Sequence, residues 1–192
     1  NSKNILLADD GGATISFDYG ENWTLQDNMP TAQFYRINTD NMFPYNIYGG
    51  QQDNTSVKIA SLSVGRWSIN QEDWHYSAGG ESAFLGFDPD DPRYVMGGSY
   101  LGTIELLDME SKMSSNVMAA PIQYLGRDAR DMKYLYNWNA PIIWSKHEPG
   151  TFYHGAQLVL RTRDNGVTWE EISPDLTRDQ DELQGKGGGP YT

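Results

Sequence analysis

The chain has 192 residues, of which 14 are Lys or Arg and 26 are Asp or Glu, and its formal net charge is −12. This charge argues against binding to nucleic acid or to an anionic membrane surface. The length permits one sizeable hydrophobic core, while the absence of cysteine excludes disulfides and thiolate metal sites. Aromatic residues make up 12% of the chain and glycines number 20, which favours short strands joined by tight turns.

Four pairs of predicted strands follow one another along the chain. In each pair a turn residue precedes an apolar strand that ends in Gly or Ala, and a second β-rich strand begins a few residues later. The small residues predict that neighbouring backbones approach closely at these strand ends. The pairs are residues 4–8 with 12–16, 44–50 with 55–59, 92–98 with 102–107, and 150–156 with 158–162.

Two further segments, residues 84–92 and 142–150, each read as an apolar strand followed by a turn that contains proline. Helix signals are sparse. Residues 127–136 and 175–183 are the stretches in which we expect a short helix. The chain is therefore predicted to be all-β.

One pattern of four residue types, Ser/Thr-x-Asp-x-Gly-x-x-Trp, occurs twice. The aspartate can accept backbone N–H bonds within a tight turn, and the glycine supplies the positive φ that such a turn needs. The tryptophan is expected to fold back onto the hairpin and to bury a large apolar surface. We call these the first DGW motif (Ser16, Asp18, Gly20 and Trp23) and the second DGW motif (Thr162, Asp164, Gly166 and Trp169) and predict that both are structural.

The spacing of the two motifs indicates an internal repeat. Their aspartates are 146 positions apart (164 − 18), which three repeats of roughly 49 residues would fill. The predicted repeats are residues 1–30, 31–75, 76–125 and 126–180, and residues 181–192 are predicted to be a Gly-rich connection. The two middle repeats lack the motif at the equivalent positions, so we expect their hairpins to lack that brace.

The DGW motifs resemble the Asp-box, or bacterial neuraminidase repeat, of sialidase-like β-propellers. Over nearly the whole chain the sequence also resembles a large group of bacterial proteins labelled as glycosyl hydrolases with these repeats, which are similar in architecture to xyloglucanase-like and sortilin-like propellers. The segments that carry this second resemblance are residues 33–36 (QFYR), 40–45 (DNMFPY), 49–54 (GGQQDN), 137–142 (NWNAPI) and 172–177 (ISPDLT).

The resemblance implies a fragment of a β-propeller with about four four-stranded blades and Asp-box hairpins. Four blades are about half to two-thirds of a closed ring, and both ends of the sequence look like cut edges. We therefore expect the remaining blades on a longer parent chain or on a partner protein. The resemblance also implies a secreted, periplasmic or cell-surface location.

Glycoside hydrolysis usually needs two carboxylates that face each other across the bond. Asp53 and Glu81 are the candidate pair, because each follows a glycine pair in a loop at a strand end. The structural alternative is that Asp53 caps a turn and that Glu81 is a solvated loop charge. The candidate ligand-binding residues are those that could bond sugar hydroxyls (Gln51, Gln52 and Asn54) and those that could stack on a sugar ring (Tyr48, Trp74 and Trp138).

Other chemistries are disfavoured. A sialidase should present three arginines that clamp the substrate carboxylate, and the arginines here do not lie at equivalent points of successive repeats. The three histidines are not at metal-ligand spacing, and residues 88–92 (DPDDP) read more simply as a tight turn than as a Ca²⁺ site. Residues 185–189 (GKGGG) lack the spacing of a phosphate-binding loop, so we expect neither a metal nor a cofactor.

Three functions stay open. The first is a glycoside hydrolase-like propeller that acts on or binds a glycan. The second is a non-catalytic propeller that binds a peptide or glycan, as sortilin-like propellers do, and the third is an accessory scaffold subunit of a larger surface complex. The first requires that the carboxyl groups of Asp53 and Glu81 lie about 5–10 Å apart.

Overall fold

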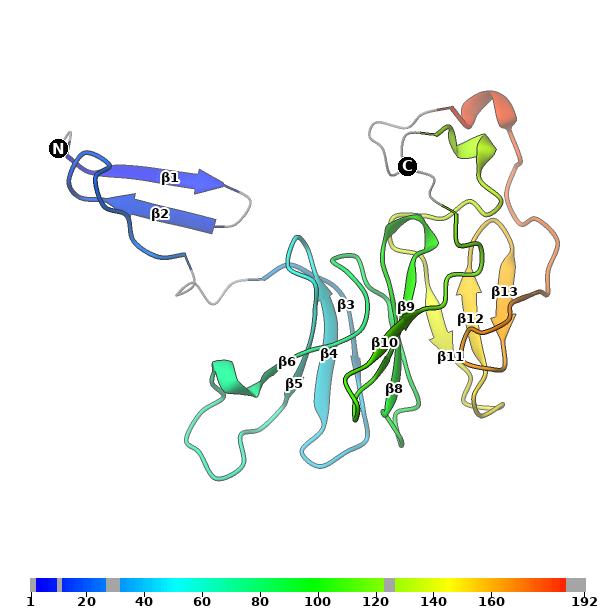
Figure 1. The fold of residues 1–192 in the computed structure, drawn as a ribbon, viewed down its shortest axis with the longest axis horizontal. Coiled ribbons are helices and arrows are strands. Elements are labelled where there is room, and N and C mark those ends of the chain that lie inside the picture. The colour runs from blue at the N-terminus through cyan, green and yellow to red at the C-terminus, as the bar shows by residue number, and fades with distance from the viewer. Residues whose placement is uncertain (1–2, 10–11, 27–31, 123–126, 186–192) are drawn as a thin grey trace. The chain divides into compact units, whose positions relative to one another are not determined.

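The computed structural model describes residues 3–9, 12–26, 32–122 and 127–185, which form four antiparallel sheets and very little helix (Figure 1). The all-β class is confirmed. The chain divides into two compact units, residues 1–33 and 34–192. The helices in the described ranges are 3-10 turns of three residues, too short to cross a membrane: η1 (Gln71–Asp73), η2 (Tyr100–Gly102), η3 (Ala129–Asp131) and η4 (Asp181–Leu183). Short helices were expected in residues 127–136 and 175–183, and only the three-residue turns η3 and η4 form there.

The described residues of the first unit form one hairpin. Strand β1 (Ile5–Asp9) pairs with β2 (Gly12–Ser16), so that Ile5 lies opposite Ser16. After the first DGW motif the chain returns beside β2, where the Thr24 N–H donates to the Ile15 carbonyl at 3.0 Å. In its described residues this sheet has two strands, where the sequence predicted four. Every residue of β1 is exposed.

The described residues of the second unit form three four-stranded antiparallel sheets, and in each the strands pair in chain order (Figure 1). The first strands of these sheets meet, because β7 lies beside both β3 and β11. Each of these sheets falls within one of the three later predicted repeats. The exception is Tyr76 at the end of β6, which lies one residue beyond the predicted repeat 31–75. The strands are β3 (Phe34–Thr39), β4 (Asn46–Gln51), β5 (Ser56–Ala60) and β6 (Trp74–Tyr76); β7 (Leu85–Gly86), β8 (Tyr94–Gly98), β9 (Ile104–Asp108) and β10 (Ser114–Asn116); and β11 (Ile142–Trp144), β12 (Phe152–Gly155), β13 (Val159–Thr162) and β14 (Glu170–Glu171).

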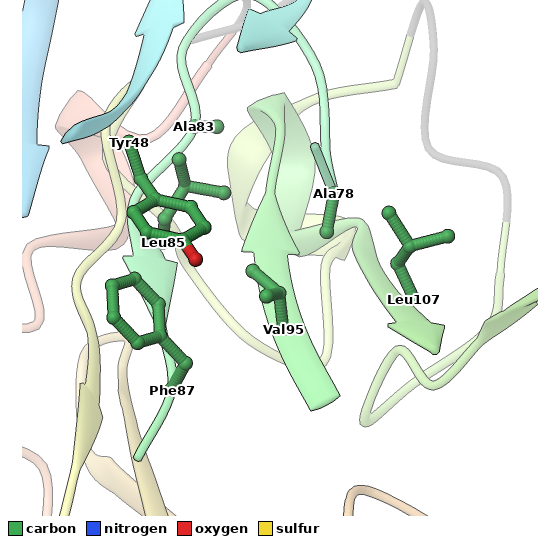
Figure 2. Packing of buried hydrophobic residues seen from close by; sticks show 7 residues of the cluster. All are labelled: Tyr48, Ala78, Ala83, Leu85, Phe87, Val95 and Leu107. Atoms are coloured by element: carbon green, nitrogen blue, oxygen red, sulfur yellow. The ribbon is translucent and has the colours of Figure 1, made fainter. Parts of the chain in front are cut away.

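Figure 2 shows the core between the first two of these sheets, where residues of β4, β7, β8 and β9 pack together with Ala78 and Ala83. Tyr48 is fully buried there, with its ring 4.3 Å from that of Phe87. Its hydroxyl donates to Asp40 at 3.0 Å, and burial together with this carboxylate raises the pKa of Tyr48 above its usual value. Asp40 also accepts the Asn46 N–H at 2.7 Å, so one buried carboxylate closes the β3–β4 hairpin.

Glycine pairs end β4 and β8 and allow a neighbouring loop to touch both strands. A Cβ on Gly50 would lie 2.6 Å from the Ala83 nitrogen, and one on Gly97 would lie 2.3 Å from the Ala78 carbonyl carbon. Any side chain at either position would therefore push away the loop of residues 77–84. The close backbone approach predicted from the small residues is confirmed at these strand ends, and it places the β6–β7 loop beside the β4–β5 turn.

The two DGW motifs fold alike. The hydroxyl of Ser16 accepts the Gly20 N–H at 2.7 Å, and that of Thr162 accepts the Gly166 N–H at 2.8 Å. Asp18 and Asp164 each accept a backbone N–H four residues later at 2.9 Å, and hydrogen bonds from that following residue lower the pKa of both carboxyls. The glycines have φ values of +93° and +86°. The predicted turn chemistry is confirmed in both copies.

The tryptophans of the two motifs differ in what they contact. The indole of Trp169 donates to the Val117 carbonyl at 2.8 Å and packs against two clusters of buried residues, so it joins the third sheet of the unit to the second. Trp23 is 41% exposed, and its indole donates to Gly20 within its own turn at 3.0 Å. The expectation of extensive burial is wrong for Trp23, because the described residues of the first unit include no second sheet to cover it.

Candidate functional site

The two candidate acids belong to neighbouring loops of the second unit. Asp53 lies in the β4–β5 turn, which is closed by a bond of 2.7 Å from the Gln51 N–H to the Thr55 carbonyl. Glu81 lies in the β6–β7 loop. This loop packs closely against Gly50 of β4 and Gly97 of β8, because neither residue has a side chain. The Asp53 N–H donates to the Glu81 carboxylate at 3.0 Å, so the structure brings the two residues together.

A single amide bridges the two carboxylates. The Nε2 of Gln52 donates to Oδ1 of Asp53 at 2.8 Å and to Oε2 of Glu81 at 2.6 Å. Since one nitrogen reaches both atoms, the two oxygens can be at most 5.4 Å apart (2.8 plus 2.6 Å). The carboxyls of retaining glycosidases lie about 5–5.5 Å apart, a separation that this upper limit permits. The two carboxylates therefore lie close together, and their role in hydrolysis stays a prediction.

A chain of hydrogen bonds holds this amide in place. The hydroxyl of Tyr35 donates to Oε1 of Gln52 and in turn accepts the indole N–H of Trp138 at 2.9 Å. The ring of Trp138 stacks on that of Tyr100, with the centroids 5.2 Å apart and the planes inclined by 22°. Because each group fixes the next, the bridging amide is pre-positioned by side chains from three separate loops and strands.

An open depression of about 310 Å³ lies at the acid pair. This volume is at the lower end of the range of about 300–1,000 Å³ typical of small-molecule sites. Its lining combines the two acids with residues of the β8–β9 turn: Asp53, Thr55, Gly80, Glu81, Ser99 and Tyr100. The arrangement can hold a polar ligand against two fixed carboxylates.

The β8–β9 turn is the counterpart of the β4–β5 turn. Each follows a glycine pair, and a bond of 2.9 Å from the Ser99 N–H to the Thr103 carbonyl matches the closing bond of the other turn. Leu101 (φ +58°) and Asp53 (φ +61°) occupy the same turn position, a left-handed one that non-glycine residues rarely adopt. Strained backbone of this kind often accompanies functional sites.

The other predicted ligand residues lie as follows. The amide of Gln51 is 6% exposed and donates to the Asn54 carbonyl, while the Asn54 amide donates to the Gln52 carbonyl, so both complete the turn. Gln52 uses both amide hydrogens on the acids, and Trp138 lies behind it, half-buried. Their predicted contacts with sugar stay predictions.

Two predicted stacking residues need correction. Tyr48 cannot stack on a sugar, because it is fully buried in the cluster shown in Figure 2 and its hydroxyl bonds to Asp40. Trp74 is exposed on β6, the last strand of its sheet, where it pairs opposite Ile59, and it does not line the depression. Neither residue is brought to the acid pair.

The sequence analysis did not select five contributors to the site: Thr55, Gly80, Tyr35, Ser99 and Tyr100. The repeat contained the signal for the last two, because Ser99 and Tyr100 follow Gly97 and Gly98 just as the β4–β5 turn follows its own glycine pair. The sequence contains no comparable signal for Tyr35, because this residue contributes to the site only through its hydrogen bond to Gln52.

Within the described ranges, no group of three His, Asp or Glu side chains is placed so that it could hold a metal ion. Residues 88–92 instead form a turn in which Asp88 accepts the Asp90 N–H at 2.9 Å. Of the predicted Gly-rich connection, residues 186–192 lie outside the described residues. No protein-family model matches the chain, and no curated protein matches it significantly.

Proposed function

We propose that the chain is part of a sialidase-like β-propeller and that it binds a glycan and hydrolyses a glycosidic bond with Asp53 and Glu81. The observation that carries this proposal is the Gln52 amide, which holds one oxygen of each acid within 5.4 Å of the other. Two carboxylates this close together on a solvent-open depression are compatible with double displacement at a sugar.

The hydrogen bonds suggest the role of each acid. Oε2 of Glu81 accepts two N–H bonds, from the Asp53 backbone and from Gln52, which suits the group that acts as a carboxylate. We assign Glu81 as the nucleophile that attacks the anomeric carbon while Asp53 gives its proton to the leaving oxygen. Water, deprotonated by Asp53, then hydrolyses the glycosyl ester and restores both groups. The configuration at the anomeric carbon is retained.

The propeller part of the proposal rests on the sheets. Three consecutive four-stranded sheets meet through their first strands, as blades do around an axis, and the two DGW motifs occupy the same kind of hairpin turn. The exposed apolar residues Ile5, Leu6 and Leu7 of β1 are the kind of surface that a further blade would cover. We propose that this cover comes from another part of the protein or from a partner, and that the protein is secreted, periplasmic or on the cell surface.

A hydrolysis screen tests the activity. The protein is incubated with neutral and acidic plant and host glycans beside three variants: Asp53→Asn, Glu81→Gln and the control Glu110→Gln. Glu110 lies just beyond β9, at the opposite end of that strand from the β8–β9 turn, and forms an exposed ion pair with Arg93. We expect turnover to fall at least about a hundredfold in the two site variants and to persist in the control.

The product's anomeric configuration, followed by NMR, gives a second readout, and retention is expected. Inversion would contradict the assigned roles. Full turnover in both site variants would contradict the site itself. Glycan binding with no turnover on any substrate would instead assign the depression to a non-catalytic binding propeller.

A further inference from the structure

Residues 137–139 reach the acid pair from the segment that leads into β11. Neither Trp138 nor Asn139 lines the depression at the acids. Both are half-buried, and each side chain donates a hydrogen bond to a distant part of the chain. One of these bonds leads towards Gln52 and the other towards Glu81. The segment therefore acts on the acid pair without lining the space for a ligand.

The path through Trp138 fixes the bridging amide. The indole N–H donates to the hydroxyl of Tyr35 at 2.9 Å, and this hydroxyl donates to Oε1 of Gln52. Because a hydroxyl can rotate, the N–H that it accepts determines where its own hydrogen points. Oε1 and Nε2 belong to one planar amide, so a fixed Oε1 also fixes the direction of the hydrogens that bond to Asp53 and Glu81.

The path through Asn139 fixes the backbone on either side of Glu81. Before Glu81, the Gly80 N–H donates to the Gly98 carbonyl at 2.9 Å. After Glu81, the carbonyl of Ser82 accepts a hydrogen bond from the Asn139 amide. Since both neighbours of Glu81 are bonded to other parts of the fold, its backbone has little freedom to carry the carboxylate away from the bridging amide.

The segment that carries these two donors has its own support. Ala140 is buried, and the Pro141 carbonyl accepts the Gly155 N–H at 3.0 Å and lies 2.9 Å from Nδ1 of His154. Both partners belong to β12, which pairs with β11 on one side and β13 on the other. Side chains supported by a paired strand can hold a site to the precision that catalysis needs.

We propose that Trp138 and Asn139 are positioning residues for the acid pair: Trp138 sets the orientation of the Gln52 amide, and Asn139 sets the position of Glu81. This inference rests on the proposed function and names the residues that hold its acids in place. Misplacement of a reacting group by about 1 Å can lower a rate about a hundredfold. Loss of either donor should therefore lower kcat and leave KM nearly unchanged, since neither residue lines the depression.

Matched substitutions test the two donors. Asn139→Asp keeps the size of the side chain but replaces its donor with an acceptor that faces the Ser82 carbonyl, whereas Asn137→Asp keeps the oxygen that accepts the Trp138 N–H. Trp138→Phe removes the indole N–H, and its control is Trp67→Phe in the exposed β5–β6 loop. We expect kcat to fall at least about tenfold in the two site variants, with KM changed less than about twofold, and to persist in both controls.

A second readout is independent of turnover. The side-chain amide protons of Gln52 are assigned by NMR as the signals lost in Gln52→Glu protein, and their exchange with water is measured. Because hydrogen-bonded protons exchange slowly, we expect protection in the wild type and at least about tenfold faster exchange in Trp138→Phe and Asn139→Asp. The two controls should match the wild type. Thermal unfolding checks that each variant folds, and Tyr35→Phe or Asn139→Ser replaces a site variant that does not.

The two readouts separate this inference from the proposed function. If the wild type hydrolyses a glycan, an unchanged kcat in either site variant, or a change confined to KM, would overturn the role of that residue and leave the proposed function standing. If the wild type hydrolyses nothing, the proposed function fails and the exchange rates decide. Faster exchange in the site variants would then still support the positioning role, and unchanged exchange would overturn it as well.

Discussion

His154 is a titratable side chain that the proposed chemistry does not use. It is 1% exposed, lies against the ring of Tyr136, and its Nδ1 is 2.9 Å from the Pro141 carbonyl, so Nδ1 carries the hydrogen. Its Nε2 has no hydrogen-bond partner among the described residues. Burial is the larger influence and lowers the pKa of His154 to about 4, against the contact with Pro141. The fold therefore holds this ring neutral.

This predicts an acid-dependent loss of stability. Above the ordinary pKa of 6.5 the ring is neutral in both the folded and the unfolded protein, so its protonation does not change the free energy of unfolding. Between pH 6.5 and about 4 only the unfolded chain takes up the proton, which lowers the free energy of unfolding by about 2 kcal/mol between about pH 7 and pH 5. Urea unfolding at pH 7, 6 and 5 measures this change in the free energy of unfolding.

A matched pair of variants isolates this effect from other groups. His154→Gln removes the titration and should flatten the dependence over this interval, even though it lowers stability at every pH. His75→Gln, an exposed position on β6, should leave the dependence unchanged. An equal slope in wild type and His154→Gln would contradict the assignment.

Backbone strain at Thr55 gives a second prediction at the residue scale. Thr55 has φ +61°, which is costly for a β-branched side chain, while the equivalent Thr103 of the other turn has φ −62°. Thr55 is exposed, so Thr55→Gly loses little packing and should raise the free energy of unfolding by up to about 1 kcal/mol. Thr103→Gly should lower it by about 1 kcal/mol. Chemical denaturation compares the two, and a loss of stability in both would refute the strain argument.

At the scale of the element, the second DGW motif depends on one hydroxyl. Thr162 is 1% exposed, and its hydroxyl accepts the buried Gly166 N–H at 2.8 Å. Thr162→Val keeps the shape but leaves that N–H without its acceptor, which should cost about 2 kcal/mol. Thr162→Ser keeps the hydroxyl and should cost less than about 1 kcal/mol. Urea unfolding of the two variants tests this, and equal losses would mean that the hydroxyl does not support the turn.

The same element shows what could be predicted from the sequence. The turn chemistry of both DGW motifs is local, since every bond spans at most four residues, and it was predictable for that reason. The burial of the tryptophans was not predictable, because the hydrogen-bond partner of Trp169 is Val117, which lies 52 positions earlier in the chain. Identical local patterns thus gave different exposures once a neighbouring sheet was present.

The candidate site divides in the same way. Glycine pairs marked the loops of Asp53 and Glu81, since a close backbone approach needs glycine whatever packs against it. The bridging role of Gln52 depends on Glu81, 29 positions later, and the position of Trp138 depends on Tyr35, 103 positions earlier. Tyr48 was misassigned for a related reason, because the residues that bury it, among them Leu85 and Val95, come from strands much later in the chain.

At the scale of the whole molecule, burial is uneven between the units. In the second unit, residues Val95–Gly98 of β8 are all buried, and β8 is paired on both sides. In the first unit every residue of β1 is exposed, and a two-stranded hairpin is at best marginally stable by itself. The locally least stable part of the described chain should therefore be residues 5–9 and 12–16.

Hydrogen–deuterium exchange measured by mass spectrometry tests this gradient, because amides exchange through local opening whose free energy follows burial and pairing. Peptides that cover β8 and β9 should exchange slowest, and those that cover β1 and β2 should exchange within the earliest time points. Repeating the measurement at tenfold lower protein concentration controls for self-association, which would protect the apolar face of β1 at high concentration alone. Protection of β1 and β2 equal to that of β8 at both concentrations would contradict the gradient and would mean that the exposed face is covered within one chain.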